Sequence, residues 1–144
     1  MQIKDVMSKD IVNLNSNDSI ERAAQLMRQF DVGAIPVCDD SKKLVGIITD
    51  RDIALDCVAS GANPNEQKIC DFMTSEPVCG SPDMDVYDAI RLMSRNQIRR
   101  LPVVENNNLV GIVSLGDISQ EPTLQDNAEV ALRNISEPGT NNHI

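Results

Sequence analysis

An internal repeat is the feature that most constrains how this chain of 144 residues folds. A shift of 66 residues places Met7 on Met73, and a shift of 65 places residues 44–47 on residues 109–112. The aligned positions are mostly apolar or glycine, so the two copies share a core pattern as well as a motif. Two copies are too few for a solenoid. The repeat therefore predicts two like units packed around a pseudo-two-fold axis.

Each copy contains the same junction between a strand and a helix, written GIITDRDI from position 46 and GIVSLGDI from position 111. Thr49 and Ser114 stand where a helix favours an N-cap hydroxyl, and Asp52 and Asp117 follow three residues later. Backbone N–H groups at a helix start attract anions, so this pattern suits a phosphate and a ribose. The same residues also suit a helix cap with no ligand. The pattern alone leaves both interpretations open.

The periodicity of apolar residues predicts the order strand, helix, strand, strand, helix in each unit, so the fold class is α/β (α+β) with two tandem β-α-β-β-α units. Ser19 and Asp85 are the N-cap candidates of the first helices. The expected buried stripe of the first of these helices is Ile20, Ala23, Ala24, Met27 and Phe30. The second helix of the first unit is expected from residue 50 to about residue 60.

The polar stretch GANPNEQ from position 61 marks the boundary between the two units. We expect a first unit over 1–62, a linker over 63–67, a second unit over 68–120 and a tail over 121–144. The tail is predicted to hold a short helix over 124–135 whose apolar contacts are Val130, Leu132 and Ile135.

Charge and composition exclude several classes of function. The formal net charge is −9, which argues against binding nucleic acid or anionic lipid. No apolar run approaches a membrane span, and the N-terminus has no signal-peptide pattern, so we expect a cytoplasmic protein. The four cysteines form no C-x-x-C pair and the one histidine is His143, so we expect reduced thiols and no metal site. Without a histidine in either repeat we expect no catalysis and no cofactor.

The repeats resemble the CBS domain, the unit named after cystathionine β-synthase. The resemblance covers residues 1–120 and rests on segments that recur in both copies. These are Val6-Met7-Ser8 and Phe72-Met73-Thr74, residues 23–27 and 89–93, residues 32–37 and 98–103, and the two strand–helix junctions. As a CBS pair, the chain would bind an adenosine-containing ligand (AMP, ADP, ATP, S-adenosylmethionine or NAD type) in clefts between its two units.

The resemblance also assigns roles to individual residues. Asp52 and Asp117 would bind the ribose hydroxyls, and Thr49 and Ser114 would contact phosphate. The expected walls of the adenine site are Ile47, Ile112, Val12 and Val78. The backbone around Val32-Gly33-Ala34 and Ile98-Arg99-Arg100 would meet the base edge or the phosphates.

The two halves differ in charge where a ligand would bind. The first has Gly33-Ala34 where the second has Arg99-Arg100, and Arg51 stands where the second has Gly116. A guanidinium offers a planar fork for phosphate, and Arg51, Arg99 and Arg100 are the candidates. The site near Arg99 and Arg100 is expected to prefer more phosphates. The pair also fits a solvated strand edge.

The sequence thus favours a non-catalytic sensor, a homodimer by resemblance, that signals to a separate effector protein. The alternative is a ligand-free CBS-pair scaffold that acts through protein–protein contacts.

Overall fold

The computed structural model describes residues 1–138, which form two compact units. The first-repeat unit consists of residues 12–77, and the second-repeat unit combines residues 1–11 with the described residues from 78 onward. The chain therefore enters through the second-repeat unit before it builds the first-repeat unit. Positions 139–144 of the expected tail lie outside the described residues. None of the helices in 1–138 has the length and apolar character needed to cross a bilayer.

The first-repeat unit is built on a four-stranded sheet in the order β1-β2-β3-β4. Its strands are β1 (Leu14–Asn15), β2 (Ala34–Cys38), β3 (Leu44–Thr49) and β4 (Thr74–Ser75). β1 pairs with β2 in parallel, and the other pairs are antiparallel. Its helices are α1 (Ile20–Phe30), the π-helix η2 (Asp52–Val58) and the 3-10 helix η3 (Ile69–Asp71).

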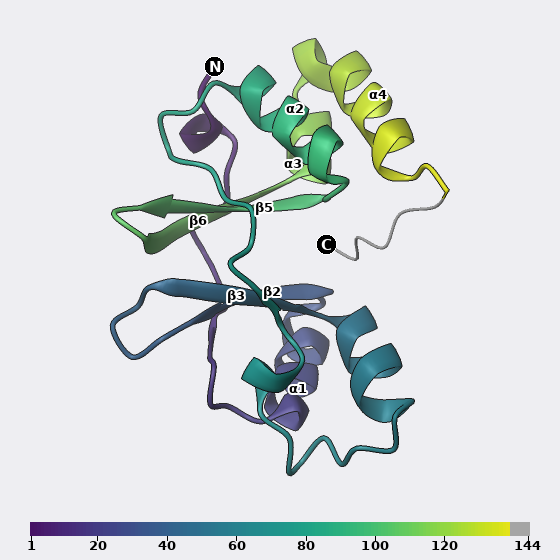
Figure 1. Ribbon diagram of the computed structural model, residues 1–144. Helices are drawn as coiled ribbons and strands as arrows, with labels where there is room; N and C mark the ends of the chain where they lie inside the picture. The colour runs from purple at the N-terminus through teal and green to yellow at the C-terminus, as the bar shows by residue number, and fades with distance from the viewer. Residues whose placement is uncertain (139–144) are drawn as a thin grey trace. The chain divides into compact units, whose positions relative to one another are not determined.

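The second-repeat unit has a β5–β6 hairpin and more helices. The elements are β5 (Arg100–Glu105), β6 (Asn108–Ser114), η1 (Ile3–Asp5), α2 (Val86–Asn96), α3 (Leu115–Ser119), η4 (Pro122–Leu124) and α4 (Gln125–Ile135). Helices α2, α3 and α4 lie on one side of the hairpin (Figure 1). α4 packs on both α2 and α3. The expected helix–strand–strand–helix order is therefore observed in both units. The expected first strand is β1 in the first-repeat unit and a single bridge at Gly80 in the second, which also adds η4 and α4.

Equivalent backbone pairs have the same register in both units. Ile47 pairs with Thr74 across β3 and β4, and the second-repeat unit has the bridge between Ile112 and Ser8. Likewise Leu14 pairs in parallel with Val37, and Gly80 forms a parallel bridge with Val103. These pairs are related by the shifts of 65 and 66 residues seen in the sequence, which confirms that the repeat is structural.

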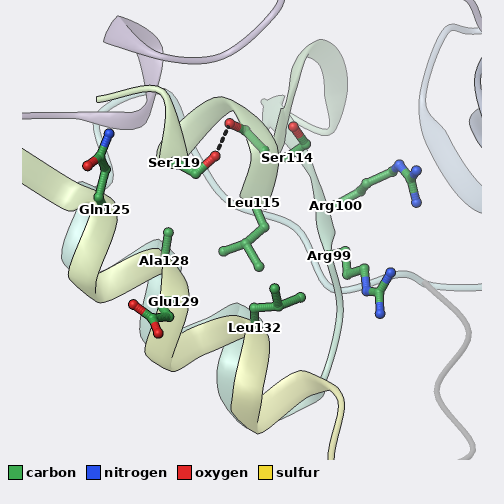
Figure 2. A pocket seen from close by; sticks show the side chains of 10 residues that line it. Arg99, Arg100, Ser114, Leu115, Ser119, Gln125, Ala128, Glu129 and Leu132 are labelled. Atoms are coloured by element: carbon green, nitrogen blue, oxygen red, sulfur yellow. Dashed lines mark hydrogen bonds between the residues drawn. The ribbon is translucent and has the colours of Figure 1, made fainter. Parts of the chain in front are cut away.

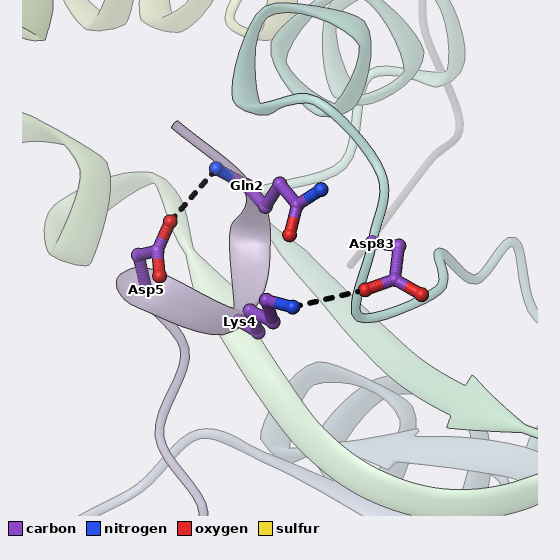
Figure 3. Close-up of polar contacts among 4 residues, drawn as sticks. All are labelled: Gln2, Lys4, Asp5 and Asp83. Atoms are coloured by element: carbon purple, nitrogen blue, oxygen red, sulfur yellow. Dashed lines mark hydrogen bonds and ion pairs between the residues drawn. The ribbon is translucent and has the colours of Figure 1, made fainter.

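The first residues of the chain are held by the second-repeat unit (Figure 3). The Ile3 N–H donates to the Met84 carbonyl at 2.9 Å, and the Ile3 side chain is fully buried. Lys4 Nζ lies 3.1 Å from Asp83 Oδ1, and Asp5 Oδ2 accepts from the Gln2 N–H at 2.9 Å. The ion pair is exposed and stabilises little, so burial of Ile3 is the main attachment.

The motif glycines allow a second segment to cross the sheet closely. A Cβ at Gly46 would lie 2.9 Å from the Thr74 carbonyl oxygen, and a Cβ at Gly111 would lie 3.1 Å from the Ser8 carbonyl oxygen. The side chains of Met73 and Met7 are closer still. The repeated glycine of the motif therefore has a packing role in each unit.

Both predicted N-caps are confirmed. Ser19 Oγ accepts from the Arg22 N–H at 3.0 Å, and Asp85 Oδ1 accepts from the Tyr87 N–H at 2.8 Å. Each satisfies a backbone donor that the first helical turn leaves unpaired.

Two predictions about helix faces were wrong. α1 buries Leu26 beside Ile20, Ala23 and Met27, whereas Ala24 is exposed and Phe30 is 49% exposed at the last residue of the helix. α4 buries Ala128, Ala131 and Ile135 instead of Val130 and Leu132, because this small-residue face fits closely against its neighbouring helices. The helix expected from residue 50 to about residue 60 is present, and over Asp52–Val58 it is a π-helix.

Candidate functional site

A pocket of about 500 Å³ lies beside the strand–helix junction of the second-repeat unit. Strand β5 and the residue before it contribute arginines, the end of β6 contributes Ser114, and α3 and α4 contribute the remaining wall. We call it the α3–α4 pocket. Its lining residues are Arg99, Arg100, Ser114, Leu115, Gly116, Ser119, Gln125, Ala128, Glu129 and Leu132 (Figure 2).

Charged and apolar groups occupy different parts of this pocket. Figure 2 shows Leu115 of α3 pointing toward Ala128 and Leu132 of α4, which makes an apolar wall. The Arg99 and Arg100 side chains lie on one side of the pocket, and Gln125 at the start of α4 lies on the opposite side. Arg99 is exposed and Arg100 is half-buried, so both guanidinium groups are open to a ligand. This separation suits a ligand with one apolar and one anionic part.

Ser114 and Asp117 form a reciprocal pair at the start of α3. The Ser114 N–H donates to Asp117 Oδ2 at 3.0 Å, and the Asp117 N–H donates to Ser114 Oγ at 3.0 Å. Because Ser114 Oγ is the acceptor, its own O–H hydrogen is left to donate toward the pocket. Asp117 is half-buried and lies next to the pocket, but it does not line it.

Thr49 and Asp52 form the same pair in the first-repeat unit. The Thr49 N–H donates to Asp52 Oδ2 at 2.9 Å, and the Asp52 N–H donates to Thr49 Oγ1 at 3.1 Å. Asp52 is only 4% exposed and Thr49 is buried as well. This pair is therefore a buried helix cap with the same reciprocal bonds.

Backbone hydrogen bonds identify which residues correspond around the two junctions. The Leu115 N–H donates to the Arg99 carbonyl at 2.8 Å, and the Asp50 N–H donates to the Gly33 carbonyl at 2.9 Å. Leu115 and Arg99 therefore stand where the first-repeat unit has Asp50 and Gly33. The apolar Leu115 thus corresponds to the acidic Asp50. The cationic Arg99 corresponds to Gly33, which has no side chain.

The remaining predicted residues of the first-repeat unit lie around this second junction. Ala34 and Ile47 are buried, Gly33 is half-buried and Arg51 is exposed. Val12, expected to wall the adenine, is half-buried and packs against the hydrophobic core of its unit.

In the second-repeat unit, the structure brings together Arg99, Arg100 and Ser114 as predicted. Ile98 is buried, whereas Ile112 and Val78 are half-buried, and none of the three lines the α3–α4 pocket. The wall from α4 was missed, because the sequence pattern marked this helix only by its apolar face. Gln125, Ala128, Glu129 and Leu132 recur at the three- and four-residue spacing of one helix face, which is the signal that indicates it.

The potential metal ligands of the described residues do not cluster. Within residues 1–138, no three histidine, cysteine or acidic side chains come together in a way that could hold a metal ion. Burial raises the pKa of the Cys57 and Cys79 thiols, and burial together with the nearby Asp39 carboxylate raises that of Cys38. These three thiols therefore favour the protonated form, which is the weaker metal ligand and nucleophile.

Comparison with known proteins identifies the family. The model of the CBS domain matches residues 3–56 and 69–122. The chain is 45% identical over 134 residues to the CBS domain-containing protein YhcV of Bacillus subtilis, covering 93% of this chain and 94% of that protein.

Two solved structures are also similar. Hypoxic Response Protein I, whose structure holds two coordinated zinc ions, has a TM-score of 0.78 and 30% identity, over 84% of this chain and 98% of that one. The CBS domain pair of protein MJ0100, in complex with 5′-methylthioadenosine and S-adenosyl-L-methionine, has a TM-score of 0.74 and 34% identity, over 83% and 98%. The resemblance seen in the sequence is thus confirmed: with two matched copies in tandem, the chain belongs to the CBS domain family.

Proposed function

We propose that this CBS pair is a non-catalytic regulatory module that senses an adenosine-containing ligand of the AMP, ADP, ATP, S-adenosylmethionine or NAD type. The observation that carries the proposal is the α3–α4 pocket, where two guanidinium groups and the Ser114 hydroxyl lie beside the apolar wall of Leu115. An aromatic base fits the apolar wall, and an anionic group fits the arginines. The related pair of MJ0100 was solved with two adenosine-containing ligands, which supports this class.

The second-repeat unit is the proposed primary site. Its junction carries Arg99 and Arg100, whereas the corresponding positions of the other unit are Gly33 and Ala34, with Asp50 and Arg51 of opposite charge nearby. A ligand with several phosphates gains more from two cations than from a neutral surrounding. We therefore propose that the second-repeat site prefers nucleotides with more phosphate groups.

The ribose contact is proposed for Asp117 before Asp52. Asp117 is half-buried, and its Oδ2 alone accepts from Ser114, so Oδ1 can accept a hydroxyl. Asp52 also accepts through Oδ2 alone, but it is only 4% exposed, so a ligand hydroxyl has much less access to its Oδ1. Thr49 and Arg51 remain the proposed phosphate contacts of a weaker first-repeat site.

The direct test is a titration of the purified protein with AMP, ATP and S-adenosylmethionine, followed by calorimetry and thermal unfolding. We expect one of these ligands to raise the melting temperature by mass action. Arg100→Ala should weaken its affinity by about tenfold or more, since a hydrogen bond to a charged group contributes roughly 1.5–3 kcal/mol. The control is Arg28→Ala, which removes an exposed arginine from the last turn of α1. Equal affinity in both variants would contradict the assignment.

A scaffold is the second candidate, because the polar pairs of both junctions are satisfied internally as helix caps. A module of this kind would bind a partner protein and gain no stability from nucleotides. If protein free of co-purified nucleotide shows no thermal shift with any of the ligands above, the scaffold becomes the better proposal.

The setting of the module is also a proposal. We propose that the chain works as a homodimer in the cytoplasm, without a cofactor, and that a separate effector protein receives its signal. The net charge of −9 supports a protein partner over nucleic acid or an anionic membrane. A ligand changes such an output only through a difference in its affinity for two states of the module.

A further inference from the structure

Helix α4 lies outside the matched family segments, which end at residue 122, yet it supplies one side of the α3–α4 pocket. Its contribution is Gln125, Ala128, Glu129 and Leu132. These positions recur at intervals of three and four and so share one face of the helix. The family pattern therefore accounts for the arginines and Ser114, but not for this wall.

The adjoining face of α4 holds the helix in place, and Ala128 belongs to both faces. Ala131 and Ile135 are buried, and Gln97, just after α2, donates from Nε2 to the Asn134 carbonyl at 3.1 Å. The residues that turn toward the pocket are thus not all needed for docking. Leu132 in particular is 45% exposed although it is apolar.

The charges around the pocket give a bound ligand a direction. Arg99 and Arg100 attract an anionic group, and Glu129 on α4 repels one. Figure 2 shows the arginines and Glu129 on different sides of the pocket, with Leu115 and Leu132 between them. An adenine nucleotide with its phosphate at the arginines would place its base or sugar against α4.

We infer that α4 is a specificity element of the second-repeat site, in which Leu132 packs on the adenosine part of the ligand while Arg99 and Arg100 hold its anionic end. This inference rests on the proposed adenosine-ligand function and adds to it a ligand contact outside the two CBS repeats. Covering Leu132 removes exposed apolar surface from water, which favours binding. The ligand would then bridge α4 and the β5 end of the unit and so stabilise the docked helix.

The test compares two substitutions on the same helix, measured by calorimetry with AMP, ATP and S-adenosylmethionine. Leu132→Asp places a carboxylate at the pocket wall and should weaken the affinity of the bound ligand at least tenfold. Val130→Asp is the matched control: Val130 is also apolar, 52% exposed and on α4, but it lines a different groove, between α2 and α4. It should leave the affinity within about twofold of wild type. Leu132→Ala should give an intermediate loss of affinity, and alanine's high helix propensity keeps α4 folded in this variant.

Hydrogen exchange gives a second measurement. The ligand should slow exchange at residues 125–135 in the wild type and in Val130→Asp, but not in Leu132→Asp. Wild-type affinity in Leu132→Asp, or equal losses in the two Asp variants, would overturn the role of α4 while leaving the proposed function intact. If the wild type binds none of the three ligands, the proposed function fails and this inference fails with it.

Discussion

Equivalent residues of the two repeats have acquired different surroundings. Asp52 is sealed with Thr49 in a buried cap, while Asp117 makes the same bonds with Ser114 in a half-buried position. The chemistry of each aspartate is therefore decided by its neighbours, although both motifs have the same spacing. This difference is why the two junctions are expected to differ as binding sites.

The motif glycines support a prediction about close packing. Gly46→Ala and Gly111→Ala should each lower the free energy of unfolding by about 1–3 kcal/mol, because the new Cβ would overlap Met73 with Thr74, or Met7 with Ser8. Chemical denaturation measures the loss. Gly116→Ala is the control, since the nearest atom to its Cβ would be 3.5 Å away. A loss of similar size in Gly116→Ala would refute the packing explanation.

The four cysteines are predicted to react at different rates. Cys70 is exposed, whereas burial raises the pKa of the Cys38, Cys57 and Cys79 thiols and keeps them protonated. A disulfide reagent at neutral pH should therefore modify one thiol quickly, and Cys70→Ser should remove that fast phase. Several fast thiols in the native protein would contradict this.

The same thiols predict how stability depends on pH. The raised pKa means that the folded protein holds these protons more tightly than the unfolded chain does. Their contribution to stability is then complete below the ordinary thiol value of 9.0 and is lost as the pH rises through the folded pKa. The free energy of unfolding of the wild type, measured from pH 7 to pH 10, should fall at the alkaline end.

At the scale of elements, helix α4 accounts for an asymmetry between the repeats. The first-repeat unit continues from η2 to η3 and β4, whereas the second-repeat unit adds α4 against α2 and α3. Ile90 and Leu115 are buried in the unit that has α4, and the aligned Ala24 and Asp50 of the other unit are exposed. Larger apolar side chains thus occur where the additional helix covers them.

A charge in the contact face of α4 should undock this helix. Ala131 is 1% exposed, so Ala131→Asp buries a carboxylate without a partner and should cost more than about 2 kcal/mol. Hydrogen exchange is expected to rise at residues 125–135 more than in the β5–β6 hairpin. Ala24→Asp is the control, because Ala24 is an exposed alanine within α1. Equal effects of the two substitutions would show that the α4 interface contributes little.

At the scale of the whole molecule, each compact unit contains the 3-10 helix that leads into the other repeat. Ile3 of η1 is buried in the second-repeat unit, and Ile69 of η3 is buried in the first-repeat unit. The Ile69 N–H donates to the Asp18 carbonyl at 2.9 Å, as the Ile3 N–H does to Met84. Each unit therefore buries an isoleucine from the segment that leads into the other repeat.

This arrangement predicts that substituting Ile3 or Ile69 lowers the stability of the unit in which the side chain is buried, and not that of the repeat that follows it in the sequence. Ile3→Ala should destabilise the second-repeat unit by roughly 2–4 kcal/mol, because it leaves a cavity in a packed core. Hydrogen exchange should rise across residues 86–135 before it rises across 20–58. Ile69→Ala, at the equivalent position, should produce the opposite order. If Ile3→Ala acted first on residues 20–58, the observed division into units would be contradicted.

The repeat, the strand and helix order, both N-caps and the family could all be predicted from the sequence. These depend on local patterns: apolar spacing, capping residues and glycines that recur at a constant shift. Only the tertiary structure shows that residues 1–11 belong to the second-repeat unit and η3 to the first-repeat unit. It also shows that Asp52 is more deeply buried than Asp117 and that α4 lines the pocket. Those outcomes depend on contacts between segments far apart in the chain. Such contacts also decide which face of α1 and of α4 is buried, and Phe30 and Leu132 lie outside those faces and are exposed despite their apolar character.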